Sequence, residues 1–95
     1  MATLARFTKQ PGEVLDFDID FRAWLADRDP DDSVASVTVS ADTGITVDSY
    51  VLSSGVVKIW LSGGTDKTAY KVTATATTDS GRIKEGEITI MVKEN

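Results

Sequence analysis

Hydrophobic and polar residues alternate along much of this chain, most clearly in the runs 57–62 and 70–77. A period of two is that of a β-strand with one buried face and one face in water. The segment between the runs, SGGTDKT, is glycine-rich and too long for a two-residue hairpin. We therefore predict two strands that are joined across the corner of a β-sandwich.

Tyr70 opens the second run and is a candidate corner tyrosine. In immunoglobulin-like sandwiches a tyrosine at the start of strand F packs inward, and its hydroxyl bonds a backbone group a few residues upstream. The disulfide cysteine of antibody domains would fall at Val72, and this chain has no cysteine. The pattern favours a cysteine-free sandwich of the immunoglobulin-like kind.

The run EVLDFDIDF, residues 13–21, has the cleanest alternation in the chain. Its apolar residues should face the core, so that Asp16, Asp18 and Asp20 line the opposite face. Three like charges in a row are unfavourable in a central strand without compensating partners, which favours an edge or exposed strand. From Phe21 the spacing becomes that of a single helical turn, in which we expect Trp24 to close one end of the sandwich.

Further short strands are predicted over 34–41 and 45–52 and near the C-terminus. The residues of the first two that should face the core are Ala35, Val37, Val39, Ile45, Val47 and Val51. In the last strand Ile83 and Ile88 differ in phase, and a β-bulge at Gly86 would restore the register. Six or seven short antiparallel strands without a long helix predict an all-β, immunoglobulin-like β-sandwich.

Residues 1–12 are predicted to form an extended N-terminal arm, with the sandwich domain spanning residues 13–95. Leu4 and Phe7 are the only large apolar residues before the stop signal Lys9-Gln10-Pro11-Gly12. Two interpretations remain open: a frayed terminus, or an arm whose Leu4 and Phe7 dock on a neighbouring subunit.

Trp60 is the main candidate for a binding residue. Its strand neighbours Val57, Ile59 and Leu61 should point inward, which leaves Trp60 on the outer face near Lys58, with Lys71 as a second possible neighbour. An exposed tryptophan on a sheet is typical of an interface anchor or of a sugar-stacking platform. A loop or terminal arm that folds over the ring is an equally good interpretation.

Composition argues against several kinds of chemistry. The chain has no histidine and no cysteine, which excludes Ser-His-Asp and Cys-His mechanisms and histidine-ligated or thiolate-ligated zinc. The aspartate-rich loop 26–32 lacks the spacing of a calcium-binding EF-hand, so a solvated acidic loop is favoured over a calcium site. We expect no catalytic site, no metal and no cofactor.

Charge is divided unevenly along the chain, whose net charge is −5. Residues 13–48 carry a local balance of −8, and the remainder carries +3. The acidic balance disfavours nucleic-acid binding, whereas the division could let copies or partners meet edge to edge. The start MATLARFTKQ has no apolar signal-peptide core, and no apolar run is long enough for a membrane span.

Two stretches together resemble the phage fiber–tail adaptor family of small virion proteins. They are TKQPGEVLDFDIDFRAWL near the start and VVKIWLSGGTDKTAYKVTATATTDSGRIKEGEITIMVKE at the end. The resemblance implies an immunoglobulin-like sandwich, present in several copies around the tail, that bridges the tail or connector to fibers or spikes. It implies no catalytic residues. Such a protein would be made in the bacterial host cytoplasm and would reside in the virion tail.

The expected function is therefore structural, through protein–protein contacts. The alternative is a carbohydrate- or surface-binding adhesion module that uses Trp60 and the loop 62–68. The residues predicted to form the protein interface are Leu4, Phe7, Asp16, Asp18, Asp20, Lys58 and Trp60.

Overall fold

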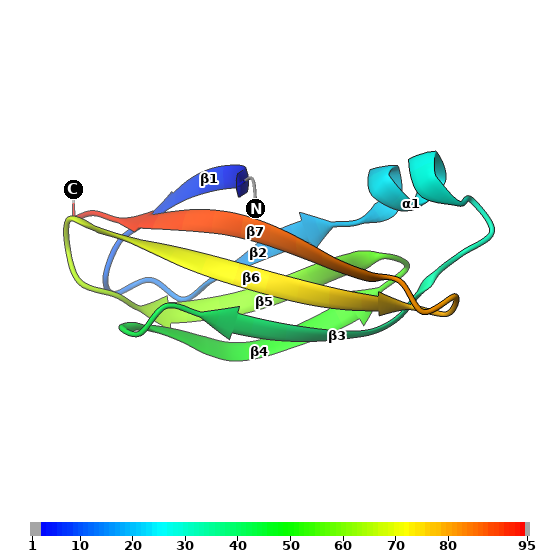
Figure 1. Ribbon diagram of the computed structural model, residues 1–95. Coiled ribbons are helices and arrows are strands. Elements are labelled where there is room, and N and C mark those ends of the chain that lie inside the picture. The colour runs from blue at the N-terminus through cyan, green and yellow to red at the C-terminus, as the bar shows by residue number, and fades with distance from the viewer. Residues whose placement is uncertain (1–2, 95) are drawn as a thin grey trace.

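Two β-sheets stack face to face, with one short helix at one end of the molecule (Figure 1). The computed structural model describes residues 3–94, and side chains from Ala5 onward. The elements in chain order are β1 (Thr3–Lys9), β2 (Leu15–Asp20), α1 (Arg22–Arg28), β3 (Val34–Ala41), β4 (Ile45–Ser53), β5 (Val56–Gly63), β6 (Thr68–Thr78) and β7 (Ile83–Val92).

One sheet has four strands in the order β1-β7-β6-β3, and the other has three in the order β2-β5-β4. All neighbouring strands pair antiparallel except β1 and β7, which are parallel. Seven strands in two sheets confirm the predicted all-β sandwich. The acidic strand β2 lies at an edge of its sheet, as its row of aspartates predicted.

The first strand differs from the arm that the sequence suggested. Thr3–Lys9 pairs with β7 and so belongs to the four-stranded sheet. Phe7 packs on Phe17 of β2, with ring centroids 5.1 Å apart. The inward residues of β1 are Ala5, Phe7 and Lys9. The sequence pattern does not show this strand because Lys9, although only 1% exposed, is a charged residue. The division of the chain into an N-terminal segment, 1–12, and a sandwich domain, 13–95, stays a prediction.

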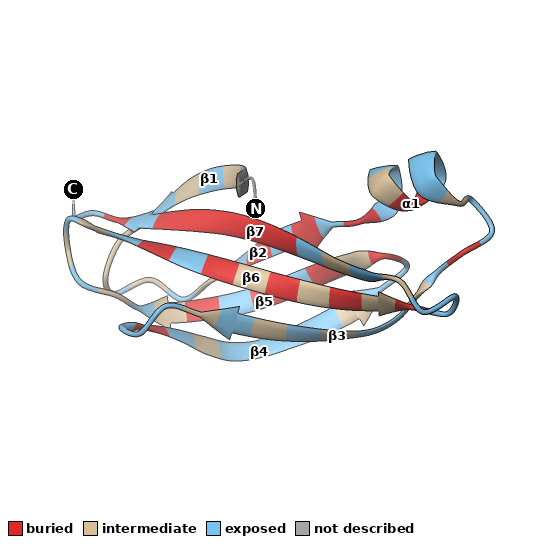
Figure 2. Cartoon of the chain, viewed as in Figure 1, coloured by how far each residue is buried: buried red, intermediate tan, exposed pale blue. Residues whose placement is uncertain are grey.

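The core lies between the two sheets; in Figure 2 its buried residues form alternating red bands on β6 and a continuous red stretch on β7. Tyr70 is 4% exposed, and its hydroxyl accepts a hydrogen bond of 2.8 Å from the backbone N–H of Thr65. The corner tyrosine predicted from the sequence is thereby confirmed. Gly44 lies against its ring at a φ of +114°, and a Cβ there would come within 2.8 Å of Tyr70 Cε1. Both the space and the backbone conformation therefore favour glycine.

Two irregularities shift the phase of the edge strands β3 and β4. Between Val34 and Ser36 the pairing of β3 with β6 slips by one residue, so Ala35 is exposed and Val34 packs on the core instead. A second slip, between Val47 and Ser49, turns Val51 outward. The inward predictions for Ala35 and Val51 were therefore wrong, because a bulge cannot be seen in an alternating pattern.

The last strand shows the reverse case. β7 pairs with β6 in an unbroken register from Ile83 to Val92, so there is no slip at Gly86 between these two strands. Ile83 is 70% exposed on the outer face. The bulge predicted at Gly86 was wrong, because the odd phase of Ile83 reflects an exposed isoleucine.

The helix α1 confirms the helical turn expected after Phe21. Phe21 and Leu25 are buried at the end of the sandwich, which anchors a helix whose N-cap makes no side-chain hydrogen bond. Trp24 is half-buried, and the Lys84 ammonium nitrogen lies 5.7 Å from its ring centroid. This geometry is that of a cation–π contact.

Candidate protein interface

The outer face of the three-stranded sheet brings together five of the seven residues predicted to form an interface. Asp16 of β2 lies opposite Trp60 of β5, and Asp18 lies opposite Lys58. Asp20, at the end of β2, is the third aspartate on the same side of this strand. All five side chains are exposed, whereas their strand neighbours face the core. We call this surface, together with Val51 of β4, the β2–β5 face.

Lys58 compensates the row of carboxylates on β2. Its ammonium lies 3.0 Å from Asp16 Oδ2 and 3.5 Å from Asp18 Oδ1. The hydrogen bond with Lys58 holds the pKa of Asp16 below its usual value, and the same bond raises the pKa of Lys58. All three side chains keep two fifths to a half of their surface in water, so a partner could compete for either sign of charge.

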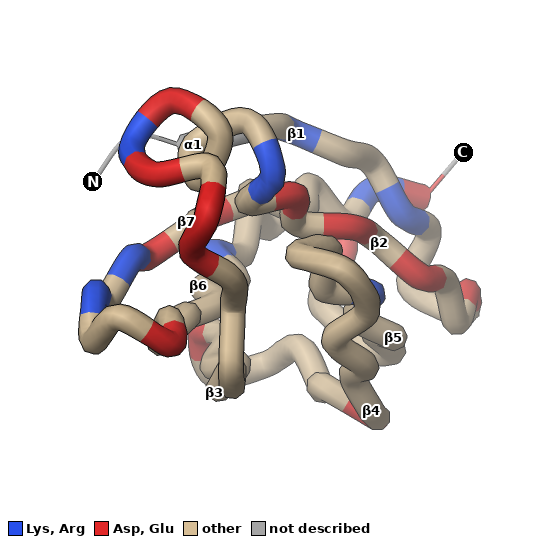
Figure 3. The backbone as a smooth tube through the Cα atoms, turned by 90° about the vertical axis from the view of Figure 1, so that its right-hand side faces the viewer, with Lys and Arg blue, Asp and Glu red and all other residues tan. Residues whose placement is uncertain are grey.

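The third carboxylate of the row has its own cation. Arg22, the first residue of α1, donates from Nε and Nη2 to both carboxylate oxygens of Asp20, at 2.7–3.1 Å. These hydrogen bonds lower the pKa of Asp20 and raise that of Arg22. Three carboxylates with two cations leave the β2–β5 face weakly acidic (Figure 3).

Trp60 and Val51 add apolar surface beside these charges. Trp60 is 39% exposed and Val51 is 60% exposed. Val51 lies opposite Lys58, and Trp60 is the next outward residue along β5, so the two side chains are diagonal neighbours. Among the residues that the structure describes, no arm or loop buries Trp60. An exposed aromatic ring bordered by ion pairs has the composition of an interface centre with a polar rim.

The two arm residues of the predicted interface do not join this face. Phe7 points between the sheets and packs on Phe17, so its ring serves the core of its own chain. The side chain of Leu4 lies outside the described residues, although its backbone belongs to β1.

The outer face of the four-stranded sheet is chemically different. β3 and β6 present hydroxyl groups there, from Ser36, Thr38, Ser40, Thr73, Thr75 and Thr77. β7 adds carboxylates in mid-strand and apolar side chains at its ends, where Ile83 and Met91 are 70% and 40% exposed. This surface has no tryptophan among the residues described.

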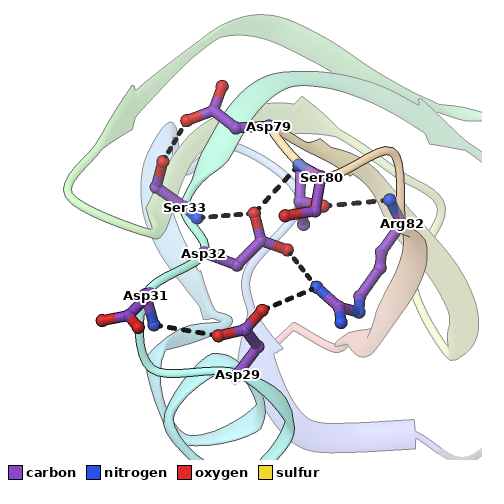
Figure 4. A network of polar contacts seen from close by, with 8 residues as sticks. Asp29, Asp31, Asp32, Ser33, Asp79, Ser80 and Arg82 are labelled. Carbon is purple, nitrogen blue, oxygen red and sulfur yellow. Dashed lines mark hydrogen bonds and ion pairs between the residues drawn. The ribbon is translucent and has the colours of Figure 1, made fainter.

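A buried carboxylate organises the end of the molecule beside α1 (Figure 4). The side chain of Asp32 is 0% exposed; its Oδ1 accepts from the backbone N–H groups of Ser33 and Ser80, and its Oδ2 accepts from Arg82 at 2.7 Å. Burial opposes the charged form, but the hydrogen bonds from Thr78, Arg82 and the two N–H groups prevail and hold the pKa of Asp32 far below its usual value.

The same network engages two of the four aspartates in the loop 26–32. Arg82 also pairs with Asp29 at 3.3 Å, so it occupies the position between two carboxylates that a cation would take. In the part of the chain that the structure describes, no group of three or more side chains could hold a metal ion. Sequence reasoning missed this network because its two halves lie about 50 positions apart in the chain.

A buried lysine was also missed. The Lys9 ammonium donates to the backbone carbonyls of Gln10, Pro11 and Gly63, at 2.8, 3.4 and 2.7 Å. Burial lowers the pKa of Lys9, although Glu13 and Asp48 act in the opposite direction. Lys9 therefore joins β1 to the end of β5, and a polar residue takes the place of an apolar one in the alternating pattern.

An open hollow of about 460 Å³ lies between α1 and the adjoining ends of β3 and β4. Its lining residues are Leu25, Asp32, Ser33, Val34, Leu52, Ser54 and Gly55. Both carboxylate oxygens of Asp32 are already hydrogen-bonded within the chain, so the hollow holds no free carboxylate from this residue.

Among residues 3–94, no helix is long and apolar enough to cross a membrane.

Comparison with known proteins identifies the family. A family model described as podophage GP4 fiber-tail adaptor protein gp77 matches residues 9–91, which is nearly the whole chain. The chain belongs to this family. The match confirms the resemblance found in the sequence and makes the chain a phage protein of the virion tail. The description of the family as fiber–tail adaptors is that of a structural role. The matched region begins at residue 9, the last residue of β1, so it contains the strands β2 to β6, β7 up to Met91, and only the end of β1. No curated protein matched the chain.

Proposed function

We propose that this fiber–tail adaptor joins the tail or connector to fibers or spikes by direct protein–protein contact through its β2–β5 face. The observation that carries the proposal is the exposed Trp60 beside Val51, bordered by Asp16, Asp18 and Lys58 on neighbouring strands. Tryptophan residues at the centre of an interface often contribute a large share of the binding energy.

The charges of the face describe the partner. Asp16 and Asp18 share a single lysine, so the row on β2 retains negative charge in the free protein. A partner surface with an apolar recess for Trp60 and with lysine or arginine at its border would complement it. Exposed ion pairs add little to stability, so these groups are available to select the partner and to speed association.

The alternative of a glycan-binding module has less support. It would use the loop 62–68 beside Trp60, yet several polar groups of this loop form hydrogen bonds within the chain. Thr65 N–H donates to Tyr70, Lys67 N–H donates to the Val92 carbonyl, and Asp66 accepts from Glu94 N–H. These three groups are therefore already engaged within the chain and would have to be released before they could orient a sugar.

The proposal extends to the assembly. The adaptor would occur in several copies around the tail, after synthesis in the host cytoplasm, and it would need no metal, cofactor or nucleic acid for binding. The surfaces that it uses would be those of the sandwich, with β1 as part of that sandwich.

A pull-down with purified tail, connector and fiber proteins of the same phage tests the proposal. We expect at least one of them to bind the wild-type adaptor and to lose most of its binding to Trp60→Ala. Met91→Ala is the matched control, because Met91 has nearly the same exposed fraction, 40% against 39%, on the other sheet. Equal loss with both variants, or binding that survives Trp60→Ala, would contradict the proposed face. A glycan array is the parallel test of the alternative.

A further inference from the structure

The four strands at sheet edges differ in how they are protected. Natural sheets discourage edge-to-edge pairing with charged side chains and bulges. Three of the edge strands carry exposed charge: β1 has Arg6, β4 has Asp48, and β2 has its row of three aspartates. The fourth, β3, reads VASVTVSA and has no charged residue (Figure 3).

The edge of β3 is also regular over most of its length. Its one irregularity, at Ala35, lies near its start, and from Ser36 to Ala41 it pairs with β6 without a slip. On the opposite side no strand among the described residues pairs with β3. Every second residue of this segment therefore directs both its N–H and its C=O away from the sheet, and another extended chain can pair with such a row.

Apolar side chains are incompletely covered along this flank. Val37 and Val39 point toward the core, as do Val47 and Leu52 of β4, yet all four are only partly buried. The residues on the strands next to them, such as Ala74 and Ala76 of β6, are fully buried. The difference arises because each sheet ends here, so a strand added to β3 would cover Val37 and Val39.

We propose that β3 pairs antiparallel with β3 of a second copy of this chain, which joins two four-stranded sheets into one of eight. Two identical edges meet only if they do not repel each other, and β3 is the edge strand that meets this condition. The same pairing of β2 would oppose two rows of aspartates. In β3, a two-fold axis at Thr38 sets residues of the same face opposite each other, with Val37 facing Val39 and Ser36 facing Ser40.

This inference does not depend on the proposed function. The β2–β5 face belongs to the other sheet, so it stays free in the pair of copies. Two copies joined at β3 would present two such faces.

Sedimentation equilibrium of the full chain over about 5 µM to 1 mM tests the pairing. We expect the apparent mass to rise with concentration from the monomer mass of 10.2 kDa toward twice that value. Thr38→Lys sets two lysines against each other at the axis and should weaken dimerisation at least about ten-fold. Thr75→Lys is the matched control: Thr75 lies directly opposite Thr38 on β6, on the same face but one strand away from the edge. It should dimerise like the wild type.

Amide hydrogen exchange at low and high protein concentration gives a second readout. Exchange in the segment 36–41 should slow as concentration rises in the wild type and in Thr75→Lys, and should stay unchanged in Thr38→Lys. A wild-type chain that remains monomeric up to 1 mM would overturn the proposal. So would dimerisation that survives Thr38→Lys or that both lysine variants abolish, given that thermal melts show both to be folded.

Discussion

The two outer faces of this sandwich are built from strands of similar length but carry different chemistry. The three-stranded sheet presents Trp60 and Val51 among ion pairs, whereas β3 and β6 of the four-stranded sheet present serine and threonine. Both faces suit an exposed strand, since threonine and tryptophan are both favoured there. Strand formation therefore does not account for the difference, and the proposed function assigns it to binding: the β2–β5 face would meet a partner and the hydroxyl-rich face would meet water.

The largest expected effect concerns the tryptophan. Trp60→Ala should weaken binding to a tail or fiber partner by about 2 kcal/mol or more, roughly 30-fold, because a central aromatic anchor is lost. Met91→Ala, on the other sheet, should change affinity by less than about two-fold. Calorimetric titration of both variants measures the contrast, and comparable losses would remove the distinction between the faces.

The interior should affect stability and leave the contrast between the faces unchanged. Lys9→Met removes the ammonium that donates to the Pro11 and Gly63 carbonyls, and one of two donors to the Gln10 carbonyl, which also accepts from Glu13 N–H. The free energy of unfolding should therefore fall by about 1–3 kcal/mol. Lys71→Met, at an exposed position of β6, should change it by less than about 0.5 kcal/mol. Urea denaturation measures both. If Lys9→Met also weakened partner binding in the fully folded protein, binding at the β2–β5 face would depend on the packing of β1.

The carboxylates of the β2–β5 face should act mainly on the association rate. The double variant Asp16→Asn/Asp18→Asn removes the negative charge that would attract a basic partner, so the rate should fall a few-fold at low salt. The effect should vanish at about 0.5 M salt, where exposed charges are screened. Glu85→Gln, on the other sheet, is the control and should leave the rate unchanged. Stopped-flow or surface-based kinetics measure the association rates. If Glu85→Gln slowed association as much as Asp16→Asn/Asp18→Asn, the carboxylates of the β2–β5 face would not be what attracts the partner.

The smallest effect is a change in pH dependence at the end of the molecule beside α1. The pKa of Asp32 is lower in the folded chain than in the unfolded chain, so its contribution to stability is present above about pH 5 and is lost as the pH falls below about 4. Asp32→Asn should lower stability at pH 7 and flatten its decline in acid. Asp31→Asn, whose side chain is exposed, should keep the wild-type profile. Thermal melts from pH 7 to pH 3 measure both profiles, and a decline in Asp32→Asn as steep as in wild type would assign the acid sensitivity elsewhere.

The sequence predicted those parts of the fold that a strict alternation encodes. β2, β5 and β6 alternate without a slip, so their core residues, the corner tyrosine and the outward direction of Asp16, Asp18, Lys58 and Trp60 could be read in advance. That the last four residues share one face could not, because it depends on the pairing of β2 with β5. The slips of β3 and β4 could not, because one extra residue reverses the phase of everything that follows it. Val51 consequently reached the β2–β5 face without having been predicted there.

The remaining misses share one physical reason. Lys9 is an inward residue because backbone carbonyls surround its ammonium, and Asp32 is buried because Arg82 and two distant N–H groups satisfy it. A pattern of apolar and polar residues treats both side chains as exposed. Their true positions depend on partners that only the folded chain brings together.

Light scattering coupled to size-exclusion chromatography tests the central claim most directly. The adaptor would be run alone and mixed with the purified tail, connector and fiber proteins of its phage, as wild type and as Trp60→Ala. The account predicts a complex of defined stoichiometry with at least one partner for the wild type and free components for Trp60→Ala. A wild-type adaptor that elutes apart from every one of these proteins, or a complex that Trp60→Ala leaves intact, would contradict it.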